Sequence, residues 1–483
     1  MRRLLALVLV VVVGCQACST VGPCDGEARL PPTIALLTAT SHQYVAETGG
    51  QGSETGGRGS CRADMAREAT GSAGASPSRL GAQENLASLD LPSLWDLALA
   101  NNPALRETAA ELEAARGRAI QAGKYPNPHF RFDEDTIGEV KGPAGTIRLL
   151  VNQEIVTAGK RRLDVAIAER GAEAASLAAQ GWKFAVLTRV RRAYYDYLGW
   201  LDTVRTDEEV VAALEQALQI TRRLVEEAKT RPKTDLLRIE ALLEQARINL
   251  ARDRVNAEAA WQQMGAEVGV PQLSMPSPVA IPAWWSENED RPLDRQIVIE
   301  RVLAAHTDLR QSAMAVERAR LGVERARAEA VPNVTLGGGW TRNFPELEAG
   351  GVVTLETPIP LWDRKQGLVH EAEARWAQAQ ATEQMTALRL RRETAEAFAR
   401  YQSARMQVDR LRAEVLPRLR QNLDLLRKGY QAGANQVAFS DVLLAEESLL
   451  TTRVTLAEAR RHLWLAVADL QGLMQLDVGE EPR

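Results

Sequence analysis

The chain has 483 residues, 45% of them hydrophobic, which is enough for two or three ordinary domains with packed cores. Its 59 Lys and Arg residues nearly balance its 63 Asp and Glu residues, so the formal net charge is only -4. Because no long basic block interrupts this balance, the composition argues against electrostatic binding of nucleic acid.

The first 15 residues have the pattern of an export signal. Two arginines precede an apolar run over residues 4–13, which is too short for a transmembrane helix of about 20 residues. Residues 12–15, VVGC, resemble a bacterial lipobox, which implies that Cys15 is lipidated and becomes the N-terminus of the mature chain. Gln16 after this cysteine implies sorting to the outer membrane. An ordinary cleaved signal is the alternative.

All four cysteines precede residue 62. Cys15 and Cys18 have the spacing of a metal or redox pair, but processing at Cys15 favours lipidation. Cys18, Cys24 and Cys61 have no assigned function, and a disulfide between two of them stays open.

The composition divides the rest of the chain into two similar parts. A low-complexity tether is predicted over residues 16–88, because residues 40–85 are rich in Gly, Ser, Thr and Ala with little apolar periodicity. Five prolines make residues 271–292 a linker that cannot be regular helix. The expected folded parts are therefore 89–270 and 293–476, followed by a tail over 477–483.

The two parts match at a nearly constant offset, as expected of a tandem duplication. The matches 204 positions apart are Leu105 with Leu309, Ile155 with Ile359, Tyr194 with Phe398 and Tyr197 with Tyr401. The matches 206 positions apart are YPN at 125–127 with VPN at 331–333, and TDLL from Thr234 with SDVL from Ser440.

Each repeat predicts the order helix, strand, strand, helix, helix. In the first, residues 92–123 predict a helix that stops at GKYPNP, and residues 129–133 and 147–151 alternate like the strands of a hairpin. In the second, residues 334–341 and 353–356 alternate in the same way. A soluble hairpin with one face on a core is the alternative.

The longest predicted helix exceeds the width of a compact domain. From Leu163 to about Thr230 there is no proline, and apolar residues recur at spacings of three and four. At 1.5 Å per residue, such a helix is about 100 Å long. Its expected partner is 234–264, which follows the turn TRPK and completes a coiled-coil hairpin.

Four strands per chain cannot close a membrane barrel, which takes about eight or more, and lipid does not tolerate open strand edges. If the strands insert, several chains must share one barrel, and three chains would supply twelve strands. The segment EIVTAGKRR would then carry a strand out of the bilayer, with Gly159 at the bend and Lys160, Arg161 and Arg162 at the headgroups. The corresponding residues of the second copy are Pro358, Pro360, Arg364 and Lys365. A soluble strand-to-helix turn is the alternative.

Over about residues 89–476, the chain resembles a TolC-type outer membrane efflux protein. IPLWDRKQGLVHEAEA and EIVTAGKRR are most similar to the heavy-metal (cobalt-zinc-cadmium) branch. The resemblance implies a mainly α fold with a small β part, in a homotrimer whose twelve-stranded transmembrane β-barrel continues into a periplasmic α-helical barrel. It also implies an outer membrane duct that receives solutes, heavy-metal cations in this branch, from an inner-membrane RND-type pump through a periplasmic adaptor.

The resemblance places functional residues at the helix turns farthest from the barrel. YQAGANQVAFSDVLLAE, from Tyr430, resembles the family's tip motif, with Gly433 at the adaptor contact and Asp441 at a possible aperture. Asp441 falls about two residues later than in the family pattern. The first copy has Pro232 where glycine is expected, followed by Lys233, with Asp235 at the acidic position.

These aspartates have two interpretations. Three symmetry-related aspartates would form a negative constriction that favours cations. In the alternative, Thr234 or Ser440 caps a helix whose first turn carries an aspartate for electrostatic reasons.

The sequence shows no pattern of a catalytic, cofactor or metal site. The five histidines are scattered and no cysteine follows residue 61, so no metal ligand set is expected. Nucleophile elbows and phosphate loops are missing, so we do not expect an enzyme. The remaining alternatives are a drug or organic-solute channel of the same family and a periplasmic coiled-coil scaffold lipoprotein.

Overall fold

The computed structural model describes residues 90–135, 145–226, 232–274, 281–282, 285, 292–344, 346–431 and 438–476. All of them lie in the second of two compact units, Gly59–Arg483. The predicted signal, tether and tail, all four cysteines, Gly433 and most of the linker lie outside the described residues.

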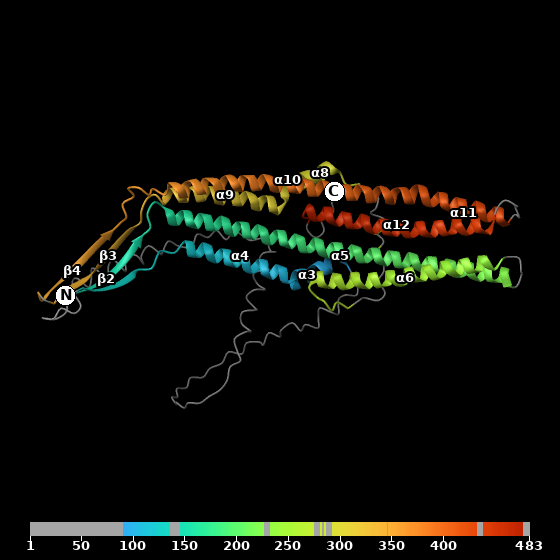
Figure 1. Cartoon of the computed structure of the whole chain (residues 1–483), viewed down its shortest axis with the longest axis horizontal. Coiled ribbons are helices and arrows are strands. Elements are labelled where there is room, and N and C mark those ends of the chain that lie inside the picture. Colours follow the sequence, from blue (N-terminus) through green and yellow to red (C-terminus); the bar gives the residue numbers. More distant parts are fainter. Residues whose placement is uncertain are drawn as a thin grey trace, which may run out of the picture. The chain divides into compact units, whose positions relative to one another are not determined.

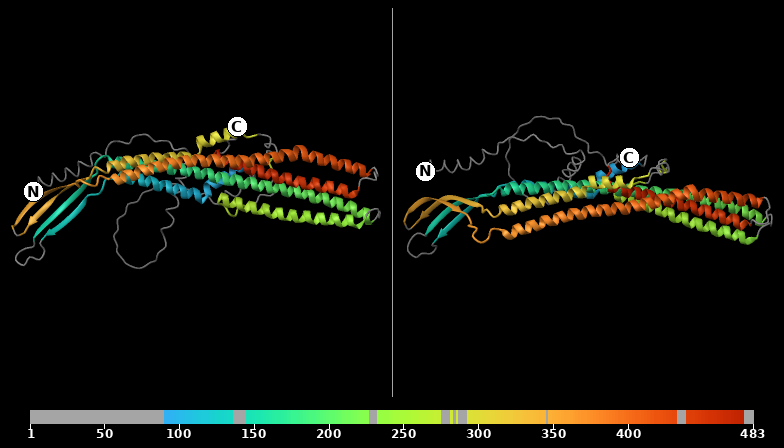
Figure 2. Two further views of the ribbon diagram at one scale, coloured as in Figure 1. Left: turned by 45° about the horizontal axis from the view of Figure 1, so that its top comes forward. Right: turned by 90° about the horizontal axis from the view of Figure 1, so that it is seen from above.

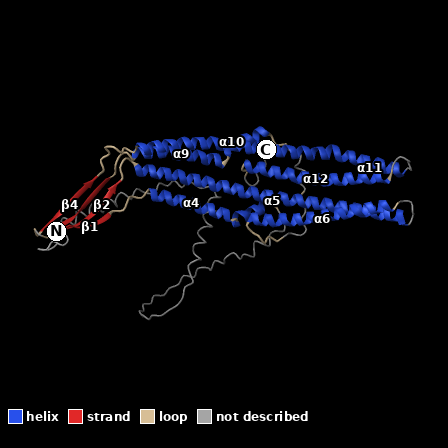
Figure 3. Cartoon of the chain, in the orientation of Figure 1, coloured by secondary structure: helices blue, strands red, loops and turns tan. Residues whose placement is uncertain are grey.

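The described chain is mainly helical with one small sheet, as predicted (Figure 3). The elements of the first repeat are α3 (Leu91–Asn101), α4 (Pro103–Ala122), β1 (His129–Asp135), β2 (Thr146–Ile155), α5 (Lys160–Glu226) and α6 (Lys233–Val268). Those of the second are α8 (Arg295–Ala305), α9 (Thr307–Ala328), β3 (Val334–Asn343), β4 (Glu348–Glu356), α10 (Gln366–Arg410), η3 (Leu411–Val415), α11 (Leu416–Gln431) and α12 (Phe439–Leu473).

The prediction of one continuous helix over 92–123 is wrong, because the helix is interrupted at Asn102. Asn102 has extended backbone angles, which the following Pro103 favours for steric reasons, and its Oδ1 accepts a hydrogen bond from the Ala104 N–H at 3.0 Å. His306 divides α8 from α9 in the same way, 204 positions later, with its Nδ1 accepting from the Asp308 N–H at 3.1 Å. The duplication therefore extends to helix caps.

The long helix of the first repeat is continuous, whereas that of the second is interrupted. α5 has 67 residues, which at 1.5 Å per residue is about 100 Å, as predicted. In the second repeat, the π-helical turn η3 separates α10 from α11, immediately before Pro417. Proline has no N–H and its ring crowds the carbonyl four residues earlier, so an inserted π turn relieves a conflict that α5 does not contain.

The four strands form one antiparallel sheet in the order β1-β2-β3-β4. Both predicted hairpins are present: β1 pairs with β2, with Phe132 opposite Leu149, and β3 pairs with β4, with Leu336 opposite Leu355. The two repeats meet where β2 pairs with β3. This leaves β1 and β4 as the outer strands of the sheet (Figure 1).

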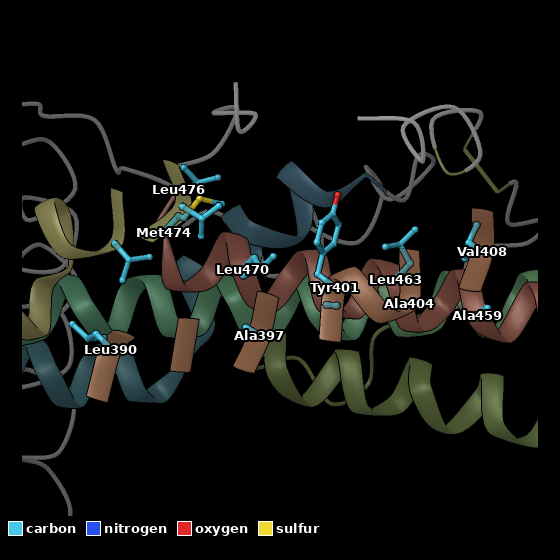
Figure 4. Packing of buried hydrophobic residues seen from close by; sticks show 13 residues of the cluster. Leu390, Ala397, Tyr401, Ala404, Val408, Ala459, Leu463, Leu470, Met474 and Leu476 are labelled. Carbon is cyan, nitrogen blue, oxygen red and sulfur yellow. The ribbon is translucent and has the colours of Figure 1, made fainter. Parts of the chain in front are cut away.

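Helices of both repeats run side by side and share a core (Figure 2). α5 packs on α4, α6, α9 and α12, and α10 packs on α9 and α12. Leu390, Ala397, Tyr401, Ala404 and Val408 lie on one face of α10 because their spacings of seven, four and three follow the helical period (Figure 4). They pack against a buried face of α12 that includes Leu463 and Leu470.

α5 and α12 approach each other closely where glycines face larger side chains. A Cβ added to Gly199 would lie 2.2 Å from Arg461 Cγ, and one added to Gly472 would lie 2.4 Å from Thr188 Cγ2. The Arg461 guanidinium then lies 4.1 Å from the centre of the Trp200 ring and donates to Asp196 Oδ1 at 2.9 Å. In the described part of the chain, none of the helices is both long enough and apolar enough to cross a membrane.

Candidate functional site: an amphipathic sheet, its junctions and the helix turns

The strand register gathers the apolar side chains of all four strands on one face of the sheet. Directly opposite residues of neighbouring strands point to the same face, so Phe130, Val151, Gly338 and Val353 form one such row. Phe130 is 70% exposed and Val353 is 82% exposed. The exposed apolar residues of this face are Phe130, Phe132, Leu149, Val151, Leu336, Trp340, Val353 and Leu355.

The opposite face of the sheet is polar. Arg131 forms an ion pair with Asp133 at 2.9 Å, and Arg148 forms one with Asp135 at 2.7 Å. A soluble sheet normally buries its apolar face and exposes its polar face. In this sheet the apolar face is exposed, so the alternative of a hairpin packed on a core does not fit a single chain.

The junction between β2 and α5 binds the turn that precedes β3. The Thr157 hydroxyl donates to the Pro332 carbonyl at 2.7 Å, and the Lys160 ammonium donates to Asn333 Oδ1 at 2.8 Å. The Asn333 amide in turn donates to Glu154 Oε1 at 2.6 Å. Ala158 and Gly159 have φ values of 53° and 69°, so the predicted bend at Gly159 is confirmed.

The prediction that Lys160 lies at the lipid headgroups is wrong. Its side chain is 2% exposed, with Glu329 Oε1 at 3.8 Å, so it joins the two repeats. Arg161 donates to the Gly123 carbonyl at 2.8 Å and lies 3.8 Å from the centre of the Tyr125 ring. Arg162 is exposed, so for this residue the headgroup role stays a prediction.

The corresponding junction of the second repeat, between β4 and α10, is largely exposed. β4 ends at Glu356, before the two prolines expected to end it. In the segment that follows, Ile359 is 76%, Leu361 61% and Trp362 87% exposed. Arg364 is exposed, and the Lys365 ammonium pairs with Asp363 at 2.6 Å.

The two aspartates at the helix turns occupy equivalent helical positions but make different contacts. Asp441 is the third residue of α12, and its carboxylate accepts a hydrogen bond from the Ala438 N–H at 2.9 Å. Asp235 is likewise the third residue of α6. The residue three positions before it, equivalent to Ala438, is Pro232, which has no N–H to donate. Asp441 therefore caps its helix in a way that Asp235 cannot.

In the alternative interpretation, the cap by Thr234 or Ser440 is wrong, because each is the second residue of its helix. Its other part is confirmed, because Asp235 and Asp441 lie in the first turns of these helices. Pro232 and Lys233 are exposed at the start of α6, as an adaptor contact would require. The turn that contains Gly433 lies outside the described residues.

Ion pairs lie within each helical hairpin and between the two hairpins near these turns. Arg222 of α5 reaches Glu240 of α6 at 3.3 Å, and Arg427 of α11 reaches Glu446 of α12 at 2.9 Å. Arg238 of α6 lies 3.9 Å from Glu447 of α12, which links the two hairpins beyond the first turns of these helices. The fold thus brings the two aspartate-bearing helix starts to the same end of the bundle.

A buried carboxyl pair between α5 and α6 was not predicted. Asp207 is 4% and Asp253 1% exposed. Burial and the hydrogen bond with Asp253 raise the pKa of Asp207 to about 7. Burial opposes ionisation of Asp253 as well, but hydrogen bonds from Arg252 and Asp207 outweigh it and lower the Asp253 pKa.

A sequence signal for this pair existed. Asp207 lies three and seven positions before the buried Val210 and Leu214, and Asp253 lies three positions after Leu250, so both carboxylates stand on apolar stripes. Within the described ranges, no three His, Cys, Asp or Glu side chains are grouped to hold a metal ion.

Comparison with known proteins gives consistent relatives. A family model described as outer membrane efflux protein matches residues 94–270 and 298–474, more than two thirds of the chain. The cobalt-zinc-cadmium resistance protein CzcC of Cupriavidus metallidurans is 25% identical over 376 residues, 76% of this chain and 85% of that protein. The nickel-cobalt-cadmium resistance protein NccC of Alcaligenes xylosoxydans xylosoxydans is 24% identical over 60% of this chain and 64% of that protein.

Solved structures share the fold. A structure of CusC has a TM-score of 0.63 at 20% identity and covers 80% of this chain and 91% of its own. VceC of Vibrio cholerae has a TM-score of 0.64 at 19% identity, with coverages of 80% and 96%. At these identities the likeness concerns the fold alone.

Proposed function

This chain belongs to the outer membrane efflux protein family, and from that premise we propose that it is the outer membrane channel of a tripartite heavy-metal efflux system. The expected resemblance to TolC-type efflux proteins, and among them to metal-resistance proteins, is confirmed. The chain is a channel protein of the outer membrane and not an enzyme. Its assembly, its partners and its cargo form the rest of the proposal.

The observation that carries the proposal is the amphipathic sheet with two outer strands. Its exposed apolar face suits lipid and its polar face suits an aqueous lumen. Lipid does not tolerate the free backbone groups of an outer strand, so β1 and β4 must find partners on other copies. Three copies supply twelve strands, which is enough to close a barrel.

The helical hairpins would then form the periplasmic extension of the trimer. In this arrangement Pro232 and Lys233, at the start of α6 and away from the strands, face the adaptor, and so does Gly433, which follows the end of α11 in the sequence. Asp235 and Asp441 lie in the first turns of α6 and α12, at the same end of the bundle, where three copies of each would surround the aperture. An RND-type inner-membrane pump supplies the energy.

The proposed cargo is a heavy-metal cation, which passes through the channel as the transported solute. Support comes from CzcC and NccC, whose names state resistance to cobalt, zinc, cadmium and nickel. A ring of carboxylates would let such cations pass without holding them in a resident site.

For the N-terminal part and the domain limits, we propose the arrangement that the sequence predicts. The chain begins with a signal over 1–15, in which Cys15 is lipidated, and a tether over 16–88. Two repeats over 89–270 and 293–476 follow, separated by a linker over 271–292, and a tail covers 477–483. Mass spectrometry of the mature N-terminal peptide tests the anchor. A lipid-modified Cys15 supports it, and an unmodified N-terminus at another residue contradicts it.

The experiment for the function combines assembly with resistance. We expect the purified chain to be a trimer in detergent and to conduct ions in planar bilayers. We expect deletion of its gene to increase sensitivity to cobalt, zinc or cadmium, with recovery when it is restored. Sensitivity to organic drugs alone would indicate the drug channel, and a monomer without conductance would indicate the scaffold.

A further inference from the structure

The contact between α5 and α6 is apolar on both sides of the buried carboxyl pair. Towards the helix turn, Val210 of α5 shares a hydrophobic cluster with Leu243 of α6. In the other direction, the ring centres of Tyr197 and Trp261 lie 5.1 Å apart. The carboxyl pair therefore forms one polar layer between two apolar layers of the same helix contact.

The second repeat has apolar residues at the equivalent positions. The offset is 204 for the long helix and 206 for the helix that follows it, so Asp207 corresponds to Leu411 and Asp253 to Ala459. Ala459 is buried in a hydrophobic cluster against which Leu411 packs. Enclosing two carboxyl groups costs more free energy than enclosing two apolar side chains. An apolar layer therefore suits this position of the fold, and packing alone does not require the carboxyls.

The arginines of α6 near the pair are bound to other carboxylates. Arg252 donates to both oxygens of Asp253, at 2.8 and 3.1 Å, and Arg254 binds Glu208 at 2.7 Å. Arg252 lowers the pKa of Asp207 as well, but burial and Asp253 raise it by more. Asp207 thus has no arginine of α6 as a direct partner.

The groups of α5 and α12 near Asp207 do not neutralise it either. Asp202 accepts hydrogen bonds from Arg205 of α5 at 3.1 Å and from Arg460 of α12 at 2.6 Å. Glu458 of α12 adds negative potential at Asp207. In the described part of the chain, the enclosed Oδ2 of Asp207 receives no hydrogen bond. A proton on Asp207 therefore supplies the positive charge that this site lacks.

α6 is the helix that responds to a change in this layer. α5 is held on its other sides by α4, α9 and α12. One end of α6 is fixed, because the Asn102 side chain donates to the Glu267 carbonyl at 2.8 Å. Between residues 233 and 253, α6 packs on α5 and shares a cluster with Leu450 of α12. Repulsion in the polar layer therefore acts on the part of α6 that leads to the helix turn.

We propose that the carboxyl pair is a proton-operated switch, which holds the first half of α6 on α5 while the two aspartates share a proton and releases it when the proton is lost. This inference rests on the proposed function, which places Lys233 at the adaptor and Asp235 at the aperture. Release of this half of α6 widens the aperture, so the conductance of the channel depends on pH.

The direction of the switch follows from the two states of Asp207. In the packed contact, burial and Asp253 raise the pKa of Asp207 to about 7, whereas a hydrated aspartate has a pKa of about 3.9. Between these values release of α6 expels a proton, so rising pH favours release. The ratio of released to packed hairpins should rise by up to about tenfold per pH unit and level off above about pH 7.

Pyrene excimer emission measures the contact without requiring a conducting channel. In the full chain with Cys18, Cys24 and Cys61 replaced by serine, the labels are attached to E215C and R247C, whose native side chains form an ion pair at 2.8 Å across the hairpin. We expect excimer emission to fall between pH 5 and pH 7 and to change little between pH 7 and pH 8.

The hairpin of the second repeat provides the matched control. R427C and E446C replace an ion pair of 2.9 Å between α11 and α12. The described residues of these two helices include no buried aspartate or glutamate. Excimer emission from this labelled pair should therefore stay constant over the same pH range.

Two neighbouring charges should shift the transition in opposite directions. R252Q removes a cation that lowers the Asp207 pKa, so the fall in emission should extend to higher pH. E458Q removes an anion that raises this pKa, so the fall should end at lower pH. A carboxyl pair that served packing alone would not give opposite shifts.

Two further variants should abolish the transition. The amide of D207N can still donate a hydrogen bond to Asp253 but carries no titrating proton, so emission should stay high at every pH. D207L with D253A introduces the residues of the second repeat, and it should also keep the hairpin packed throughout.

Single-channel recordings of the unlabelled proteins connect the switch to the channel. We expect the open fraction of the parent to rise with pH by the same factor as the released fraction, and that of D207N to stay at its value at pH 5. Equal emission curves for labelled proteins with and without D207N would overturn the switch and leave the proposed channel standing. A pH-dependent emission with equal open fractions in the parent and D207N would overturn the coupling to the aperture. Absence of a conducting trimer would overturn the proposed function and the coupling together.

Discussion

At the scale of single residues, the carboxyl pair Asp207 and Asp253 couples proton binding to the packing of α5 on α6. The Arg252 guanidinium binds Asp253 at 2.8 and 3.1 Å, and Asn256 donates to it at 3.2 Å, so Asp253 keeps the negative charge. Asp207 is left beside a buried anion, and Glu458 of α12 adds further negative potential. Near neutral pH the two aspartates therefore share one proton.

The Asp207 pair predicts that stability falls as pH rises. The Asp207 pKa is about 7 in the folded protein and about 3.9 in an unfolded chain, so between these values folding takes up a proton. The resulting stabilisation is fully present below about pH 4 and is lost through about pH 7, at up to ~1.4 kcal/mol per pH unit. Melting temperatures at pH 5, 6, 7 and 8 should show this slope in the parent and a flatter one in D207N. Parallel curves would contradict the shared proton.

The turn aspartates predict a charge effect that is separable from helix capping. An asparagine side chain can still accept from the Ala438 N–H, so D441N keeps the cap and removes the charge. If the carboxylates surround the aperture, D235N and D441N should reduce single-channel block by divalent cations several-fold while the trimer stays intact. Unchanged conductance and block in both variants would remove the aspartates from the aperture.

At the scale of elements, α5 forms the axis on which α3, α4, α6, α9 and α12 pack. Its contact with α12 depends on Gly199, where backbone and the Arg461 stem lie too close to admit a Cβ, and on the ion pair between buried Asp202 and Arg460 at 2.6 Å. Interruption of the second long helix at Pro417 shows that such a continuous axis exists in only one repeat.

Two glycines on α5 predict opposite effects of the same substitution. In G199A the new methyl group would lie 2.2 Å from Arg461 Cγ, which must move together with its contacts to Trp200 and Asp196. We expect a destabilisation of about 1 to 3 kcal/mol, as for other overpacked sites. G171A, where nothing lies within 4 Å, should gain up to about 1 kcal/mol from helix propensity. Chemical denaturation curves compare them, and equal effects would contradict the close α5–α12 approach.

At the scale of the whole molecule, the sheet is the part that a single chain leaves incomplete. The helices bury apolar clusters on one another, such as the one that contains Leu390 and Leu463, whereas the apolar face of the sheet is exposed and its outer strands have free edges. The exposed apolar face and the free strand edges belong to the same four strands. A closed ring of copies surrounded by lipid would cover the apolar face and pair the edges.

Consecutive residues of β4 give a matched test of this orientation. Val353 lies on the apolar face, whereas Val352 lies on the polar face opposite Gly339, which leaves room for a longer side chain. V353R should reduce the membrane-inserted trimer strongly, because an arginine facing lipid costs about 2 to 4 kcal/mol at mid-depth. V352R should insert normally. Equal trimer yields for the two variants, compared on unheated and heated gels, would contradict a lipid-facing apolar side.

Much of the secondary structure could be predicted because it depends on neighbours in the sequence. Alternation over 129–133 and 147–151 predicted β1 and β2, and the proline-free run after Leu163 predicted α5. The break at Asn102 was also readable, since a residue before proline avoids helical angles. Burial of Lys160 was not, because its basic neighbours resemble a surface run and its partner Asn333 is 173 positions away.

By itself, the sequence determined the duplication, the element order and the alternation that separates two faces of each strand, because these are properties of local period and of internal similarity. Only the tertiary structure decided that β2 and β3 join the repeats, that Lys160 is buried and that Asp207 meets Asp253. The physical reason is that register, burial and the pKa of a carboxyl depend on which distant residues are brought into contact. A local pattern supplies candidates for such contacts, and packing selects among them.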